Sequence, residues 1–232
     1  CHYGLSKEKL DKIFALNDID IYVIQECKKN DIDSIFTHEG NYWHGDSTES
    51  GGDPDKELGV AVFSKNEKIC IRKASWLNEV VDYRYVVPYI IKNKESGEEC
   101  VIANVWTKGC DKNNLKYKNY HEPIFKAFKT SLSIINEQKI IVMGDFNTGS
   151  EVNAASAKWY ANLKTLFTSN NFVNCSADKE YSPTYFKGNG SWLDDHCFIK
   201  RTWETKYKLK FGDKEDWISA TLSDHIPMFL EI

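Results

Sequence analysis

The sequence predicts one domain of mixed α/β (α+β) class, rich in strands and without strict alternation of strands and helices. Short apolar runs of strand length recur along the chain and are bounded by turn residues. A few longer segments instead carry apolar residues at three- and four-residue spacing, as amphipathic helices do. A length of 232 residues suits one unit, so we expect residues 1–232 to form a single domain.

The first half of the chain is predicted to begin with a helix that leads into a series of strands. Ser6 can cap a helix over residues 6–15, and residues 19–24 then have the pattern of a buried strand. Such a run of strands separated by short turns is typical of an antiparallel meander. Its further strands are predicted at residues 59–64, 68–76, 85–92 and 100–106, with a turn at 95–98 before the last.

The second half of the chain is predicted to place two helices among shorter strands. Residues 119–136 carry Ile124, Phe128 and Leu132 at helical spacing, which favours an amphipathic helix packed on a sheet. A second helix is predicted at residues 154–170. The strands expected around these helices are residues 139–143, 192–199, a hairpin-like segment at 206–211 and a closing strand at 228–232.

Composition and charge exclude several classes of protein. A net charge of −4 argues against a protein that coats nucleic acid by bulk electrostatics, so an anionic substrate has to be attracted locally. No segment approaches the roughly 20 apolar residues of a membrane helix, and we expect no membrane insertion. Seven cysteines without a C-x-x-C pair are interpreted as free thiols, which favours the cytoplasm. We also expect a monomer.

Three acidic clusters each follow an apolar, strand-like run. The first delivers Glu26, the second is Gly-Asp-Phe-Asn at residues 144–147, and the third is Ser-Asp-His-Ile-Pro at residues 223–227. Ends of strands are where rigid scaffolds place reactive groups. Taken alone, each acidic residue would be interpreted as a solvated turn or a helix cap.

Taken together and in order, the three clusters resemble the motifs of the endonuclease/exonuclease/phosphatase superfamily. The stretch Trp-Leu-Asp-Asp-His-Cys-Phe at residues 192–198 is similar to a fourth motif, and residues 59–64 are similar to the family's second strand. The match spans nearly the whole chain. This resemblance implies a four-layer α/β sandwich, in which two mixed β-sheets pack face to face between helices and the site lies at one end of the sheets.

The resemblance also implies a metal-dependent hydrolase and assigns roles to residues of this chain. Asp145 corresponds to the general base that activates a water, and Asn147 to the group that orients the phosphate or a metal-bound water. Glu26 is expected to bind Mg²⁺ (or Mn²⁺), because this ion prefers oxygen ligands and is usually held by one or two carboxylates. His225, kept cationic by Asp195, would bind the phosphate oxygens in the transition state.

Two of these assignments leave alternatives open. Asp194 competes with Asp195 for the pairing with His225, because adjacent carboxylates in a strand point to opposite faces and only one can face the site. The family pattern favours Asp195. Asp224 is expected either to approach the same metal from the other side or to complete a second metal position.

The chain departs from the family pattern at two places. The family carries an Asn metal ligand on its first strand, and we expect this Asn just upstream of Cys1. Trp106 stands where many relatives place a His or Tyr that contacts the phosphate, and an indole can donate one N–H but cannot transfer a proton. The remaining candidates for contact with the substrate at this place are Lys108, Tyr117 and His121.

Nucleic acid is the substrate, and so the partner, that the sequence favours. Residues 108–129 and 200–214 combine cations with aromatic side chains, which suits a phosphate backbone with stacked bases, although each could also be a solvated face. We therefore predict a nuclease acting on DNA or RNA. The alternatives are a phosphatase or phospholipase-type hydrolase of a small or lipid phosphate ester, and a binding module that has kept the fold and lost the activity.

Overall fold

The computed structural model gives the backbone for most of the chain, and the account below is confined to that part. The described residues are 6–16, 18–33, 42–45, 58–74, 86–107, 124–125, 127–129, 139–149, 154–176, 182–201 and 207–232.

A six-stranded sheet forms one half of the core. Its strand order is β4-β5-β6-β7-β11-β8, and every neighbouring pair is antiparallel except β6 and β7, which run parallel. The first three of these strands form an antiparallel meander, as predicted for residues 68–76, 85–92 and 100–106. The sequence also assigns residues 59–64 to this meander, which is wrong, because that strand pairs in the other sheet. The strands are β4 (Ile69–Lys73), β5 (Val86–Asn93), β6 (Glu99–Trp106), β7 (Ile140–Asp145), β8 (Phe172–Asn174) and β11 (Asp195–Lys200).

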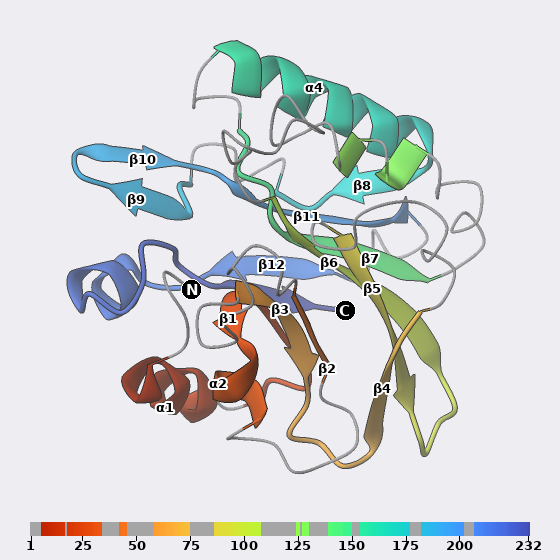
Figure 1. Ribbon diagram of the computed structural model, residues 1–232. Helices are drawn as coiled ribbons and strands as arrows, with labels where there is room; N and C mark the ends of the chain where they lie inside the picture. Colours follow the sequence, from red (N-terminus) through yellow and green to blue (C-terminus); the bar gives the residue numbers. More distant parts are fainter. Residues whose placement is uncertain are drawn as a thin grey trace.

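A second layer of strands faces the first (Figure 1). It consists of a three-stranded sheet of order β1-β3-β2 and a separate pair, β12-β13. A small hairpin, β9-β10, stands apart from both layers. These strands are β1 (Tyr22–Lys28), β2 (Tyr42–Gly45), β3 (Leu58–Phe63), β9 (Tyr185–Lys187), β10 (Gly190–Trp192), β12 (Lys208–Phe211) and β13 (Met228–Glu231).

Helices cover the outer face of each layer, which gives the four-layer sandwich (Figure 1). Helix α4 (Ala154–Ser169) packs Leu163 and Phe167 onto the six-stranded sheet. On the opposite side, α1 (Lys7–Ala15), α2 (Lys29–Asp33) and the π-helical turn η4 (Glu215–Ser219) cover the three-stranded sheet. Between the two layers of strands lies a third hydrophobic cluster. The fold class is therefore the one expected.

The sequence predicts most element types correctly but places several boundaries differently. Helix α1 begins after Ser6, whose side chain accepts a hydrogen bond from the Lys9 N–H, as expected of a cap. The strand predicted at residues 192–199 is split between β10 and β11, because the main chain of Asp194 bonds to Thr184 and Phe146 at the junction. The predicted helix 119–136 lies mostly outside the described residues.

Several short elements have no clear signal in the sequence. Strands β2, β8, β9 and β10 contain three or four residues each, and α2 contains five, which is too short for periodicity to reveal. None of the helices in the described part of the chain is both long and apolar enough to cross a membrane.

Gly144, one residue before the end of β7, allows β7 to lie unusually close to β6. Its φ of 140° lies outside the range that other residues prefer, and a Cβ there would overlap the carbonyl oxygen of Val105. Strands β6 and β7 pair in parallel at this point, Val105 opposite Gly144 and Trp106 opposite Asp145. The glycine therefore fixes the position from which the Asp145 side chain projects.

We expect Gly144→Ala to lower the free energy of unfolding by about 3 kcal/mol or more, because the added carbon meets backbone that cannot move aside. Gly97→Ala is the matched control: Gly97 has a φ of 74° but open space around it. That change should cost only about 1 kcal/mol of backbone strain. Urea denaturation of the two variants measures the difference, and equal losses would contradict the role of the close approach.

Candidate active site

The site is built where β7 ends and β11 begins. Asp145 is the last residue of β7 and Asp195 the first of β11, and the antiparallel register places the two directly opposite each other. Residues opposed in this way project from the same face of a sheet. Both side chains are buried. The topology therefore brings two carboxylates together that are 50 positions apart in the sequence.

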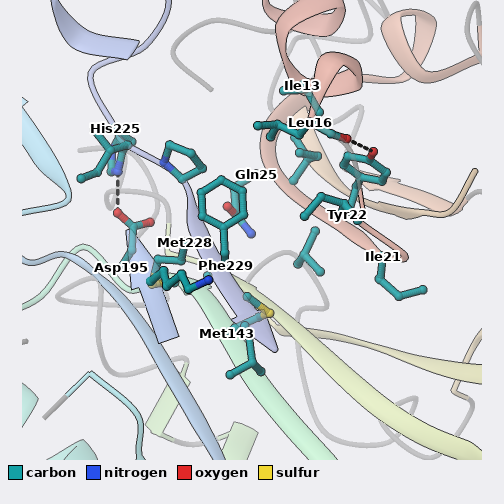
Figure 2. A pocket seen from close by; sticks show the side chains of 18 of the residues that line it. Ile13, Leu16, Ile21, Tyr22, Gln25, Met143, Asp195, His225, Met228 and Phe229 are labelled. Carbon is teal, nitrogen blue, oxygen red and sulfur yellow. Dashed lines mark hydrogen bonds and ion pairs between the residues drawn. The ribbon is translucent and has the colours of Figure 1, made fainter. Parts of the chain in front are cut away.

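His225 lies against these carboxylates from the loop before β13. Its Nδ1 is 2.8 Å from the Asp195 Oδ2, as the dashed line in Figure 2 shows. Burial alone would lower the pKa of His225, but the charge and hydrogen bond of Asp195, joined by the charge of Asp145, raise it to about 9. The imidazole is therefore a cation at neutral pH, paired with Asp195 and not with Asp194.

Asp195 is the ionised partner of this pair. Burial acts to raise its pKa, but the charge of His225 and hydrogen bonds from His225 and Thr184 outweigh burial and lower the pKa below the usual range. The Thr184 hydroxyl also accepts the Asp195 backbone N–H, at 3.1 Å. Thr184 thus holds both the backbone and the carboxylate of Asp195, as a group that orients a histidine requires.

Asn147 holds the carboxyl group of Asp145 on both oxygens. Its backbone N–H donates to Oδ1 at 2.7 Å, and its side-chain amide donates to Oδ2 at 2.9 Å and to the Thr107 carbonyl at 2.6 Å. Asn147 reaches this position with a φ of 46°, in the left-handed region that Asn tolerates better than most residues. The Gly-Asp-Phe-Asn motif is therefore a local clamp.

Asp145 has an unusually high pKa for an aspartate. Burial is the main cause, and the charge of Asp195 acts in the same direction. The charge of His225 and the hydrogen bond from Asn147 oppose these effects without cancelling them. A buried carboxylate with a raised pKa, 2.7 to 2.9 Å from fixed donors, is suited to accept a proton near neutral pH.

Glu26 and Asp224 supply two further carboxylates on the other side of the site. A bulge in β1 between Gln25 and Cys27 takes Glu26 out of the ladder with β3, and its φ is 54°. Asp224 immediately precedes His225. Glu26 lines the same cavity as Asp145, Asp195 and His225.

A cavity of about 940 Å³ connects these groups (Figure 2). Glu26, Asp145, Asp195 and His225 line one part of it, and the rest runs between β1 and β13 over apolar side chains of the sheet opposite, including Met143. Figure 2 shows the pair His225–Asp195 at one side of this space and Tyr22 at the other. The chemical groups therefore line one continuous cavity.

A model of the endonuclease/exonuclease/phosphatase family matches residues 3–225. The chain belongs to this family. Members of the family hydrolyse phosphoester bonds and generally use divalent metal ions. A search of curated proteins found no significant match to this chain.

Solved structures of endonuclease/exonuclease/phosphatase proteins share the fold at low sequence identity. A 3′ phosphatase, NExo, from Neisseria, bound to a product DNA hairpin, is 17% identical, with a TM-score of 0.64 over 97% of this chain and 93% of its own. The AP endonuclease LMAP from Leishmania major is 10% identical, with a TM-score of 0.67 over 94% of this chain and 80% of its own. A mannosyl-6-phosphatase from Bacteroides thetaiotaomicron is 18% identical, with a TM-score of 0.59 over 96% and 88%. The TM-scores of these structures establish the shared fold, and their low sequence identities leave the substrate of this chain open.

Of the residues expected to contact substrate, Trp106 lies in the described part of the structure and does not line the cavity. Trp106 is 4% exposed and packs in the cluster between the two layers of strands. Lys108, Tyr117 and His121 lie outside the described residues. Their role in substrate binding stays a prediction for this family member.

Two site residues, Tyr185 and Thr184, have no clear signal in the sequence, and a third, Asp194, is named there only as the rival of Asp195. Tyr185 forms a β-bridge with His225, and its ring lies 4.7 Å from the imidazole. Thr184 precedes it and holds Asp195. Asp194 is 5% exposed, its Oδ1 has no hydrogen-bond partner among the described residues, and burial followed by the charge of Asp195 raises its pKa to about 6. Tyr185 and Thr184 are revealed only by the position of the β9-β10 hairpin next to the loop before β13.

The Asp195 carboxylate is expected to keep His225 protonated through neutral pH. In the wild-type protein, an NMR titration of His225 should give a pKa of about 9. In Asp195→Asn the same titration should move to about 6.5 or lower, because burial then acts with less opposition. Asp216→Asn, at an exposed partner of Lys12, is the control and should leave His225 unchanged.

Proposed function

We propose that this family member is a nuclease that hydrolyses phosphodiester bonds of DNA or RNA with Mg²⁺ or Mn²⁺. The observation that carries the proposal is the His225–Asp195 ion pair facing the clamped Asp145 across one sheet. This arrangement supplies a proton acceptor and a fixed cation within reach of one phosphate. Phosphoester hydrolysis requires both, since charge develops on the phosphate oxygens while water loses a proton.

The carboxylates present suit a hard divalent cation. Among the described residues, no three His, Cys, Asp or Glu side chains lie close enough to form a metal site of protein ligands alone. Mg²⁺, however, is usually held by one or two carboxylates, with substrate phosphate and water as the other ligands. Glu26 lines the cavity together with Asp145 and His225, and Asp224 is the neighbour of His225 in the chain, so these two carboxylates are the ligands proposed for the ion. A bound ion would polarise the phosphate as a Lewis acid.

Each side chain of this site has its own role in the proposed reaction. Asp145 accepts the proton of the attacking water, and Asn147 holds the carboxylate in the orientation that this transfer needs. His225 is cationic and binds the non-bridging phosphate oxygens, which gain negative charge in the transition state. Asp195 and Thr184 keep the imidazole oriented.

Cations at the cavity support a polyanionic substrate. Lys208 and Lys210 on β12 line the same cavity as His225 and belong to the segment with interleaved aromatic residues that the sequence singles out. Local cations attract a phosphate backbone even where the net charge is −4. The free thiols of Cys27, Cys175 and Cys197 support a reducing compartment, and we place the activity in the cytoplasm.

Asp145→Asn should reduce hydrolysis of nucleic acid by a factor of about 10³, the usual contribution of a positioned general base. The wild-type and variant proteins would be assayed with Mg²⁺ and with Mn²⁺ on single- and double-stranded DNA, on RNA and on a panel of phosphate monoesters and lipid phosphates. Asp213→Asn, an exposed change on the loop after β12, is the matched control. Turnover confined to monoesters or lipids would replace the nuclease proposal by the phosphatase or phospholipase-type alternative, and no turnover of any ester would favour a binding module.

The dependence of the reaction rate on pH should be bell-shaped. Asp145 must be ionised, and because its pKa is raised, activity is lost as the pH falls through a value well above that of an ordinary aspartate. His225 must be protonated, so activity is lost as the pH rises through about 9. A kcat/KM profile between pH 4 and pH 11 measures both limbs, and a rate that stays flat above pH 9 would show that the charge of His225 is not used.

A further inference from the structure

The apolar part of the cavity lies between two strand edges. Strand β1 pairs with β3 and strand β13 pairs with β12, and in the described part of the chain each has a partner on one side only. Between them the cavity is lined by residues 21–26 on one side and 226–232 on the other, and we call this part the β1–β13 groove. Figure 2 shows Ile21 and Tyr22 at one side of the groove and Met228 at the other.

The groove follows the edges of these strands and not their faces. Successive side chains of a strand point to opposite faces, so a cavity on one face would be lined by every second residue. Here every residue from 21 to 26 and from 226 to 232 lines the cavity. The groove therefore runs along the backbone of both strands on the sides away from β3 and β12. A strand edge of this kind is a template for pairing with another strand.

Apolar side chains form the other two walls of the groove. Cys100, Ile102, Ile141 and Met143 of the six-stranded sheet lie on one side, and Ile13 and Leu16 of α1 lie on the other. Met143 is only half-buried although β7 is a central strand, whereas its neighbour Val142 is fully buried on the opposite face. A strand in the groove would meet apolar groups on both of its faces, as interior strands do.

The groove fits one β-strand better than a small apolar molecule. The six residues 21–26 extend about 20 Å at roughly 3.3 Å per residue. A lipid tail would fit the apolar walls but would leave the backbone groups of both edges without partners, which costs free energy for each group. An extended polypeptide meets both requirements, because its backbone pairs with the edges while its side chains contact the walls. The occupant that fits is therefore a strand rich in apolar residues.

Helix α1 indicates where such a strand comes from. The helix ends beside the start of β1, where the Tyr22 hydroxyl donates to the Leu16 carbonyl at 3.5 Å. One turn earlier, the ammonium of Lys12 lies 5.5 Å from the centre of the Trp217 ring, and the Trp217 carbonyl accepts the N–H of Ser223 in the loop before β13. The chain thus enters α1 from the end of the groove at which β13 begins.

We propose that the β1–β13 groove holds one extended strand of the polypeptide that precedes helix α1. This strand ends where α1 begins, so it runs parallel to β1, which ends at the same side, and antiparallel to β13, which begins there. The strand, α1 and β1 then form a βαβ unit, and residues 7–21 are long enough for its crossover. The strand joins the three-stranded sheet and the pair β12-β13 into one sheet.

The strand has a consequence for the active site. Glu26 lies near the end of β1 and His225 lies just before β13, and the described residues form no ladder between these two strands. A strand paired with both fixes the separation of the two side chains. It is a positioning element of the site, and its presence does not depend on which phosphoester the protein hydrolyses.

Alkylation of two natural cysteines tests the proposal in the full-length natural protein. Cys100 lines the groove, whereas Cys70 on β4 is also half-buried but does not line it. Modification of both by N-ethylmaleimide would be followed by mass spectrometry. Leu230→Asp places a carboxylate in the groove, and Asn162→Asp, exposed on α4, is the matched control. We expect only Leu230→Asp to accelerate modification of Cys100, on the order of tenfold and with Cys70 unchanged, because the strand is released more often.

Hydrogen exchange gives a second readout that needs no variant. In the wild-type protein, the amides of β1 and β13 on the sides away from β3 and β12 should exchange as slowly as those of the central strand β6, because ladder hydrogen bonds protect them. Exchange of these amides within seconds would show that the edges are open to water and would overturn the proposal.

Other occupants of the groove give different results. Protection of Cys100 that is lost on dilution would assign the groove to a second copy of the chain, and protection lost on extraction with organic solvent would assign it to a lipid; either result overturns the proposal. Met143→Lys, on another wall of the groove, is measured alongside Leu230→Asp, since general unfolding accelerates Cys70 as well. If neither variant accelerates Cys100 alone, the proposal fails.

Discussion

Two carboxylates face each other across neighbouring strands, and one imidazolium is hydrogen-bonded to Asp195 and within the influence of the charge of Asp145. Asp145 and Asp195 are held in register by the β7-β11 ladder, so their repulsion cannot be relieved by moving apart. The charge of His225 lowers the pKa of both carboxyl groups, and its hydrogen bond to Asp195 keeps that residue ionised. Burial and the charge of Asp195 nevertheless raise the pKa of Asp145. Because the rigid sheet holds the two carboxylates at fixed positions, Asp145 is suited to act as a base and His225 as a cation.

The backbone accepts unusual conformations where these groups are placed. Glu26 and Asn147 have positive φ angles, and Gly144 allows a close approach of strands that a side chain would block. Each feature costs free energy and persists only where the surroundings fix it. The surroundings here are the hydrophobic clusters on both faces of the six-stranded sheet, which hold β6, β7 and β11 in place.

Charge balance is local in this protein. The molecule is acidic overall, yet His225, Lys9, Lys208 and Lys210 line one cavity together with Glu26, Asp145 and Asp195. Among these groups, the charges of His225, Asp145 and Asp195 raise or lower one another's pKa values. The electrostatic potential at the site is thus set by the residues that line the cavity and not by the net charge of the chain.

The sequence by itself determined most of the longer strands, helices α1 and α4, and the motifs that carry Glu26, Asp145, Asn147, Asp195 and His225, because these depend on local periodicity and on short ordered patterns. Tertiary structure decided which carboxylate meets His225, since Asp194 and Asp195 are equivalent until the register of β11 with β7 is known. It also decided that Thr184, Tyr185 and Lys9 belong to the site and that Trp106 lies in the core. Contacts between residues far apart in the chain leave no local pattern, so only the packing of the layers could reveal them.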